Sequence, residues 1–175
     1  MASKHFAVPL TILLALFLPL AAQADGFEAG FGVGAIEFDD ELGGETEVRF
    51  DGRFGYNVTH AFEIEAQVIH ATSILSLDLD AYMVNGIWNF HFNKKIVTYV
   101  LGGIGSATVE FSPLFGENVD DDGFAYQVAS GVRFFFNESQ RFAFRLELSA
   151  LGEETFGESS IHKTLAAGLT WRFGD

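Results

Sequence analysis

The sequence has no cysteine, few basic residues and, beyond its N-terminal segment, no long hydrophobic run. The absence of cysteine excludes a disulfide framework and thiolate metal sites. Ten lysines and arginines stand against 24 aspartates and glutamates, which gives a formal net charge of −14. Nucleic acid is therefore not an expected partner, because a phosphate backbone needs a basic surface. A membrane-spanning helix needs about 20 consecutive apolar residues, and residues 25–175 contain no such run.

The N-terminal segment has the composition of an export signal. Lys4 precedes an apolar run from Phe6 to Ala22, and the motif Ala-Gln-Ala ends at Ala24. A charged start, an apolar stretch and a small-residue cleavage motif are typical of a secretory signal peptide. We therefore predict a cleavable signal peptide at residues 1–24 and a single mature domain at residues 25–175. Two prolines interrupt the apolar run, which disfavours the alternative of a retained membrane helix.

In the mature part, apolar residues recur at every second position. The stretch from Gly123 to Leu151 shows this most clearly. On both sides of Asn137–Gln140 its even positions are mostly apolar, and its odd positions include Gln127, Arg133 and Arg145. A period of two predicts strands with one apolar face, and a short polar break predicts a hairpin turn. Each segment is also about as long as a tilted membrane-crossing strand, roughly 9–11 residues.

The same pattern repeats along the chain and predicts eight strands. They are expected at residues 27–35, 45–56, 62–68, 80–92, 96–111, 123–136, 142–151 and 161–173. Their connections alternate between tight turns (57–60, 93–95, 137–140) and longer loops (39–44, 72–78, 112–122, 152–160). Outer-membrane barrels have short turns on one side and longer loops on the other. The predicted fold is all-β, an eight-stranded antiparallel up-and-down transmembrane β-barrel.

The position of the aromatic residues indicates which face of the sheet meets lipid. A soluble barrel of the lipocalin type has an apolar lumen and a polar exterior, so alternation alone does not decide the facing. Here many rings fall on the apolar face beside the tight turns, as in the interfacial girdles of membrane barrels. On strand 96–111 both faces are largely apolar, and we expect the odd-numbered set, with Tyr99, to face outward. The predicted girdle comprises Tyr56, Phe62, Phe90, Phe92, Tyr99, Phe134, Phe136, Phe142, Trp171 and Phe173. A second band, near the loops, would hold Phe38, Tyr82, Phe111 and Phe124.

The opposite face carries charges of both signs. The interior of an eight-stranded barrel is about filled by side chains, so inward charges have to pair with one another. We predict an ion-pair network in the lumen, made of Glu47, Arg49, Asp51, Arg53, Glu63, Glu65, Arg133, Arg145, Glu147 and Arg172. The alternative is a narrow ion pathway gated by exchange of these pairs.

Four stretches carry a resemblance to a known family: GFEAGFGVGA, FDGRFGYNVTHAFEIEAQV, GFAYQVASGVRFFF and LAAGLTWRF. They are distributed from residue 26 to residue 173, and over essentially its whole length the mature chain resembles the small eight-stranded outer-membrane β-barrel proteins such as the OmpA membrane domain and OmpX. This resemblance implies a monomer in the outer membrane of a Gram-negative-type envelope, surrounded by outer-membrane lipid and lipopolysaccharide. It also implies delivery by the outer-membrane insertion machinery. Family members commonly end on the aromatic residue that this machinery reads, whereas here Gly174 and Asp175 follow Phe173.

The predicted loops are acidic, and we expect a solvated surface there rather than a metal site. Their carboxylates match no calcium-loop spacing, and neither a metal nor a cofactor is predicted. The residues are Asp39, Asp40, Glu41, Glu117, Asp120, Asp121, Asp122, Glu153, Glu154 and Glu158.

The predicted role is non-enzymatic, either structural or interactional, in the envelope. Two alternatives remain open: a soluble periplasmic ligand-binding barrel, and a barrel enzyme that modifies lipid A. For the enzyme, Glu158, Ser160 and His162 share one face as an orienting acid, a nucleophile and a base would require. His70, with Thr72 and Ser73, is a similarly placed candidate of the same kind.

Overall fold

The computed structural model describes residues 26–38, 46–72, 77–111, 119–136, 138–155 and 158–174. The predicted signal peptide lies outside these residues. Eight strands are present: β1 (Phe27–Glu37), β2 (Thr46–Asn57), β3 (Phe62–Thr72), β4 (Leu77–His91), β5 (Ile96–Phe111), β6 (Val119–Phe135), β7 (Phe142–Thr155) and β8 (Glu158–Phe173). Within the described ranges, no helix is long and apolar enough to cross a membrane.

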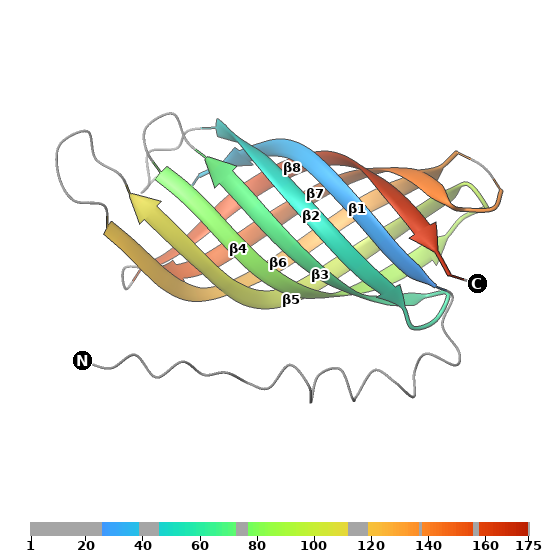
Figure 1. Ribbon diagram of the computed structural model, residues 1–175, viewed down its shortest axis with the longest axis horizontal. Coiled ribbons are helices and arrows are strands. Elements are labelled where there is room, and N and C mark those ends of the chain that lie inside the picture. Colours follow the sequence, from blue (N-terminus) through green and yellow to red (C-terminus); the bar gives the residue numbers. More distant parts are fainter. Residues whose placement is uncertain are drawn as a thin grey trace.

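The strands form one closed antiparallel barrel in sequence order (Figure 1). Each strand pairs with the next, and β1 pairs with β8 from Phe27↔Phe173 to Glu37↔Lys163. This confirms the predicted all-β, eight-stranded up-and-down barrel. Closure satisfies the backbone hydrogen bonds between strands and removes sheet edges, which a sheet surrounded by hydrocarbon requires.

The three tight turns and the start and end of the barrel lie together at one end of the molecule (Figure 1). We call this the tight-turn end, and the opposite end, where β1, β3, β5 and β7 finish, the loop end. Side chains fix the turns locally. For example, the Asn93 side-chain oxygen accepts hydrogen bonds from the backbone N–H groups of Lys95 (2.8 Å) and Ile96 (2.9 Å). Asparagine is a common turn residue because its side chain can bond the following backbone in this way.

At the loop end, several strands extend further than the sequence pattern predicts. β6 begins at Val119, β7 continues to Thr155 and β8 begins at Glu158. The residues expected in two acidic loops, Asp120, Asp121, Asp122, Glu153, Glu154 and Glu158, are therefore on strands, which corrects the prediction. Pairs such as Val109↔Asp121 and Glu153↔Ser160 continue the ladder, because a polar side chain does not interrupt backbone pairing. Asp39, Asp40, Glu41 and Glu117 lie outside the described residues.

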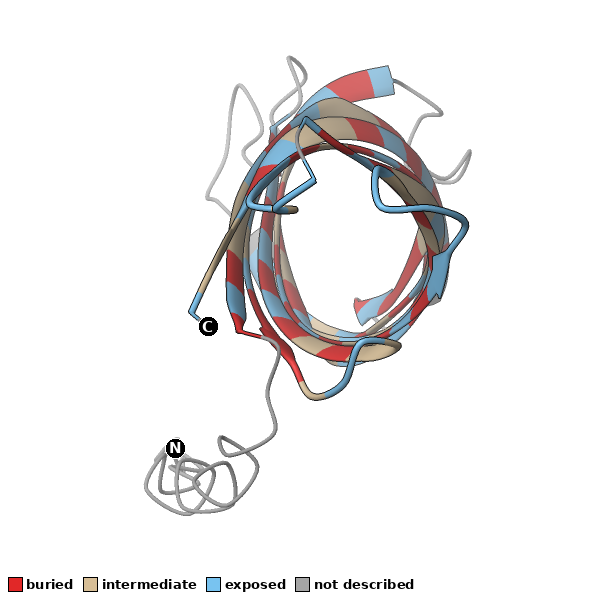
Figure 2. Cartoon of the chain, turned by 90° about the vertical axis from the view of Figure 1, so that its right-hand side faces the viewer, coloured by how far each residue is buried: buried red, intermediate tan, exposed pale blue. Residues whose placement is uncertain are grey.

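The barrel is apolar outside and polar inside. Burial alternates along every strand, as the bands in Figure 2 show. Large side chains such as Phe31 (65% exposed), Val128 (61%) and Leu165 (60%) face outward. Buried positions include Arg49, Arg133, Glu63 and Glu147, each at most 1% exposed. A soluble protein reverses this arrangement, so the exterior is built to contact lipid.

Strand β5 faces opposite to the prediction. Val97, Tyr99 and Leu101 lie inside, at 1%, 1% and 5% exposure, whereas Val100 and Ile104 lie outside at 48% and 62%. Because both faces of β5 are apolar, its facing is determined by pairing rather than by its own pattern. Tyr99 pairs with Asn89 of β4 and Gly131 of β6, both of which are on the lumen face. Directly paired residues share a face, so Tyr99 belongs to the lumen and not to the aromatic girdle.

The lumen is divided into two layers. Toward the loop end its filling is largely apolar, with the buried pair His162 and Glu153 among the apolar side chains. Phe38, which directly follows β1, is 4% exposed and packs into this layer rather than into an outer aromatic band. The charged side chains occupy the middle and the tight-turn part. The apolar layer contains Ile36, Phe38, Ile69, Ala71, Leu79, Ala81, Met83, Ala107, Val109, Ala125 and Leu151.

Candidate functional site

The candidate site is the charged part of the lumen, where arginines and carboxylates from six strands meet. Because side chains alternate along each strand, every second residue of β1, β2, β3, β6, β7 and β8 projects into the same narrow space. The ion pairs join five arginines to five carboxylates, so that the formal charge of the network is zero. The arginines are Arg49, Arg53, Arg133, Arg145 and Arg172, and the carboxylates are Glu28, Asp51, Glu63, Glu65 and Glu147.

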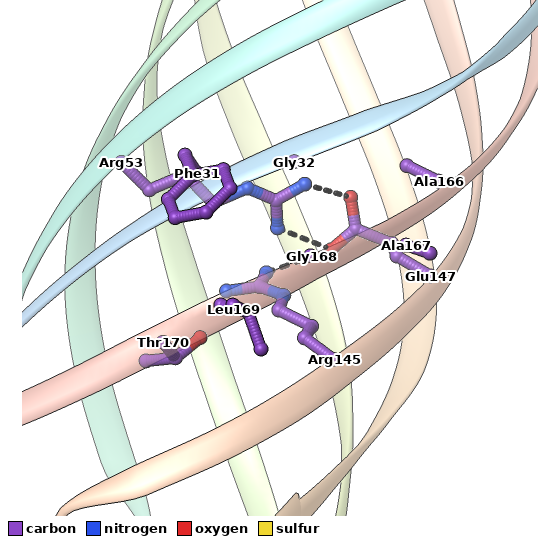
Figure 3. A pocket seen from close by; sticks show the side chains of 10 residues that line it. All are labelled: Phe31, Gly32, Arg53, Arg145, Glu147, Ala166, Ala167, Gly168, Leu169 and Thr170. Carbon is purple, nitrogen blue, oxygen red and sulfur yellow. Dashed lines mark hydrogen bonds and ion pairs between the residues drawn. The ribbon is translucent and has the colours of Figure 1, made fainter.

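Glu147 of β7 is the centre of the network (Figure 3). Arg53 of β2 donates to both of its oxygens, at 2.9 and 3.0 Å. Arg145 donates to Oε2 at 2.7 Å, and the Tyr99 hydroxyl donates to the same oxygen at 2.7 Å. Arg145 also pairs with Glu65 at 2.7 Å. Strands β2, β3, β5 and β7 are thereby connected through one carboxylate and its immediate partners.

Asp51 links this centre to Arg49, which lies further toward the loop end of the barrel. Its carboxylate accepts from Arg53 Nε at 2.5 Å and from Arg49 at 3.0 Å. Arg49 also donates to the Thr164 hydroxyl of β8 at 2.7 Å. The Asp51 carboxylate occupies the space that Gly32 leaves on β1, since a Cβ atom at Gly32 would lie 2.8 Å from Asp51 Oδ1. Glycine on β1 therefore makes room for this ion pair.

A second group of ion pairs lies near the tight-turn end. Arg133 contacts Glu63 at 2.9 Å and Glu28 at 3.2 Å, and Arg172 contacts Glu28 at 3.2 Å. Tyr99 joins this group to the centre, because the guanidinium groups of Arg133 and Arg145 lie 5.0 and 4.5 Å from its ring centroid. Such cation–π contacts stabilise a buried guanidinium in addition to its ion pairs.

Neutral amide side chains occupy the space beside the charges. Asn89 accepts a hydrogen bond from Arg133 at 3.3 Å. The Gln67 amide lies within hydrogen-bonding distance of Asn85 (3.0 Å) and Gln127 (3.1 Å). The cavity enclosed beside Gly32, Arg53, Arg145 and Glu147 has a volume of about 10 Å³, which is close to the minimum for one water molecule. The charged part of the lumen is therefore packed with side chains.

Comparison with known proteins agrees with this geometry. Residues 9–173 match the model of the outer membrane protein beta-barrel domain family. The chain belongs to this family. No curated protein matches it in sequence. Among solved structures, Neisserial surface protein A (NspA) has a TM-score of 0.76 at 13% identity, covering 86% of this chain and 99% of NspA.

Two further members of the outer-membrane barrel class are similar in fold. The Ail attachment invasion locus protein of Yersinia pestis has a TM-score of 0.57 at 18% identity, covering 85% of this chain and 99% of Ail. The N-terminal barrel of Pseudomonas aeruginosa OprF has a TM-score of 0.55 at 13% identity, covering 85% of this chain and 100% of that domain. The family and the fold indicate that this outer-membrane barrel protein lies in the outer membrane.

All ten residues expected in the lumen network lie on the inner face of the barrel, and the ion pairs given above include nine of them. Glu47 also interacts with a neighbouring group, and it lies closer to the loop end, at 9% exposure. Sequence reasoning left out Glu28, although its position among the inward glycines of β1 indicates its facing. It also left out Tyr99, whose facing could not be found from β5 alone.

Many aromatic residues of this outer-membrane barrel lie around the tight-turn end. Rings of β1, β2, β7 and β8 contact one another: Phe27 lies 5.1 Å from Tyr56 and 6.1 Å from Phe173, and Trp171 lies 5.0 Å from Phe173 between ring centroids. Apart from Tyr99, the expected girdle residues lie on the outer face or on the adjoining turns. These are Tyr56, Phe62, Phe90, Phe92, Phe134, Phe136, Phe142, Trp171 and Phe173.

The candidate catalytic residues do not share one face of this outer-membrane barrel. Ser160 and His162 are 7% and 0% exposed and face the lumen, where His162 Nε2 lies 3.6 Å from Glu153 Oε1. The Glu158 side chain is outside the described part. His70 faces outward and its Nδ1 lies 2.8 Å from Asp80 Oδ1, while Ser73 is not among the described residues. Across the described ranges, no group of three or more histidine and acidic side chains is arranged to hold a metal.

Proposed function

We propose that this protein is a non-enzymatic, monomeric barrel of the outer membrane with a closed lumen, acting through its surface rather than as a pore or catalyst. The observation that carries this proposal is the neutral, interlocked network across the lumen, together with the apolar layer above it. Moving an ion through the barrel would require separating buried ion pairs, which costs several kcal/mol per uncompensated charge. It would then require passage through the loop-end layer, whose filling is largely apolar.

The exposed carboxylates at the loop end favour a role in surface interactions. Asp120 and Asp122 lie on the outer face of β6, beyond Phe124, and Asp78 and Asp80 lie on β4, beyond Tyr82. This arrangement suits contact with lipopolysaccharide, whose anionic groups are bridged by divalent cations. An Ail structure contains the heparin analogue sucrose octasulfate. The acidic character of the present chain argues against a similar polyanionic ligand here.

We also propose that residues 1–24 are removed during export and that the insertion machinery delivers the mature chain to the membrane. Mass spectrometry of the protein isolated from outer membranes tests the first point. A mature N-terminus at Asp25 is the expected result, and retention of residues 1–24 would contradict it.

Planar-bilayer recording tests the closed lumen. The expected result is a silent bilayer after insertion of folded protein, with folding verified by heat-dependent gel mobility. Reproducible conductance steps would overturn the proposal in favour of an ion pathway. Detergent dependence distinguishes the proposed membrane barrel from a soluble barrel. We expect the protein to stay in solution only with an amphiphile, because its outward face is apolar.

A lipid A enzyme is a separate possibility that an activity assay decides. Ser160 and His162 face the lumen, which argues against access by a lipid A acyl chain. We expect purified protein and its Ser160→Ala variant to leave lipid A unchanged in mixed micelles. Release of fatty acid by the wild-type protein but not by the variant would establish an enzyme.

A further inference from the structure

A groove of about 450 Å³ lies at the tight-turn end, beside the point where the chain enters and leaves the barrel. Three segments form it: the β2–β3 turn, the β6–β7 turn and the end of β8. Its described lining contains three basic side chains and two aromatic rings, and no carboxylate. The lining residues are His60, Ser139, Gln140, Arg141, Trp171, Arg172, Phe173 and Gly174.

Arg141 is the cation in the groove that is available to bind an anionic ligand. It is exposed and makes no ion pair with any described residue. Arg172, in contrast, is already held by Glu28 at 3.2 Å and by the Gln140 side-chain oxygen at 3.4 Å. An exposed guanidinium without an acidic partner retains its full capacity for bidentate hydrogen bonds to a phosphate.

The turn that carries Arg141 is fixed in place. Gln140 has a positive φ of 52°, which is uncommon for a residue other than glycine. Its side-chain Nε2 donates to the Lys94 carbonyl of the neighbouring turn at 2.8 Å. The Arg141 carbonyl accepts from the Arg172 N–H at 2.7 Å. Arg141 therefore projects from a braced backbone, which lowers the entropy cost of binding through it.

The lysines and arginines outside the lumen network gather at this end. In the described part of the chain they are Lys94, Lys95, Arg141 and Lys163, and all but Lys163 belong to the tight-turn end. One exposed carboxylate, Glu138, also lies at the tight turns, 4.0 Å from Lys94. The other outward carboxylates of the described residues, such as Asp80 and Asp122, are at the loop end. The charge of this acidic protein is thus distributed along the barrel axis, with the cations at the tight turns. Basic side chains next to a membrane favour anionic lipids.

The aromatic wall of the groove sets its depth in the membrane. Trp171 and Phe173 belong to the girdle, and the Trp171 ring stacks on Phe142 with an interplanar angle of 8°. Tryptophan in such girdles lies at the level of the lipid headgroups. The groove consequently has a cationic side toward water and an apolar side toward the acyl chains.

We propose that this groove binds an anionic glycerophospholipid of the periplasmic leaflet, with Arg141 contacting the phosphate and Trp171 and Phe173 contacting the glycerol and upper acyl chain. The inference rests on the outer-membrane location and on the tight turns facing the periplasm, as they do in this class of barrel. Lipopolysaccharide phosphates would lie in the opposite leaflet, at the loop end.

Lipid-selective quenching of Trp171 tests the proposal. The chain has two tryptophans, so Trp88→Phe leaves Trp171 as the single fluorophore. This variant is refolded into phosphatidylcholine vesicles that contain either brominated phosphatidylglycerol or brominated phosphatidylcholine at equal mole fraction. We expect phosphatidylglycerol to occupy the quenching position about fivefold more often than its mole fraction predicts, the preference expected for one basic residue at an anionic surface.

Matched variants in the same background assign the preference to the groove. Arg141→Gln should reduce the preference to about one, and Arg141→Lys should retain most of it. Lys163→Gln makes the same charge change on the outer face near the loop end, where Lys163 is 75% exposed, and should leave the preference unchanged. Heat-dependent gel mobility verifies that every variant is folded.

Three outcomes would overturn the proposal that this groove binds an anionic lipid. One is equal quenching by the two lipids in the Trp88→Phe protein. The second is an equal loss of preference in Lys163→Gln. The third is complete displacement of the preference by inorganic phosphate, which would indicate a phosphate site rather than a lipid site. Failure of the membrane location itself is distinguishable, because then neither brominated lipid would quench Trp171.

Discussion

Arg53 and Glu147 form a bidentate ion pair across the lumen, although 94 residues separate them in sequence. β2 and β7 are not neighbours in the sheet, so this contact cannot form within a single hairpin. It forms when the barrel closes and the two inner faces come within reach of each other. The network is therefore both the filling of the lumen and a link between opposite walls.

Removing the charge of Glu147 should strongly destabilise the barrel. Glu147→Gln leaves Arg53 and Arg145 with less compensation inside the lumen, and breaking a buried pair from one side typically costs about 3–5 kcal/mol. Urea unfolding in lipid vesicles, followed by tryptophan fluorescence, measures the change. Glu138→Gln on the exposed β6–β7 turn is the control and should leave the free energy of unfolding unchanged. Equal values for the two variants would show that the network contributes no stability.

The sequence predicts the fold well because local alternation and turn composition are sufficient for it. On β2 and β7, one face holds Phe and Leu while the other holds Arg and Glu, so both strand and facing follow from the residues alone. β5 lacks this contrast, with Thr98, Val100 and Ile104 on one face and Val97, Tyr99 and Leu101 on the other. Its facing depends on pairing with β4 and β6, which is a property of the assembled sheet.

The candidate site is predictable in composition but not in connectivity. Alternation selects the inward arginines and glutamates, yet it does not show that Glu147 is shared by Arg53, Arg145 and Tyr99. These partners come from different strands, and their heights depend on strand tilt and register. The sequence pattern also predicts strands that are too short at the loop end. Glu153 and Ser160 are polar residues of the kind found in loops, but their backbones continue the β7–β8 ladder.

Tyr99→Phe should destabilise the barrel more than the same change on the outside. The hydroxyl donates to Glu147 at 2.7 Å and accepts from Arg145 Nε at 2.6 Å, while the ring keeps its contacts with the guanidinium groups. Loss of hydrogen bonds to charged groups typically costs about 1.5–3 kcal/mol. Tyr82→Phe, which alters a ring that is 56% exposed on the outer face, is the matched control for urea unfolding. If the two variants unfold alike, Tyr99 does not stabilise the network.

Single cysteines on β5 should report its facing directly, because the native chain has no cysteine. Val100→Cys carrying a fluorophore should be quenched by nitroxide lipids, since residue 100 is 48% exposed on the outer face. Leu101 is 5% exposed and faces the lumen. Leu101→Cys should therefore react slowly with the fluorophore, and nitroxide lipids should quench the attached fluorophore only weakly. The reverse pattern would mean that Tyr99 faces lipid after all, and the network around Glu147 would have to be redrawn.

Gly32 and Gly52 offer a matched test of how tightly the lumen is packed. They belong to adjacent register pairs, Gly32↔Asp51 and Phe31↔Gly52, but lie on opposite faces of the sheet. A Cβ atom at Gly32 would lie 2.8 Å from Oδ1 of Asp51, whose two carboxylate oxygens are held by Arg49 and Arg53 respectively. A Cβ atom at Gly52 meets nothing within 4 Å.

Gly32→Ala should therefore cost about 1–3 kcal/mol, the usual penalty for overpacking a filled interior. Gly52→Ala should be neutral or slightly stabilising, because glycine in a strand loses more conformational entropy on folding and packs no side chain. Urea unfolding of both variants in the same vesicles measures the difference. Equal stability of the two would mean that Asp51 can move away without loss, and that its ion pairs with Arg49 and Arg53 do not fix its position.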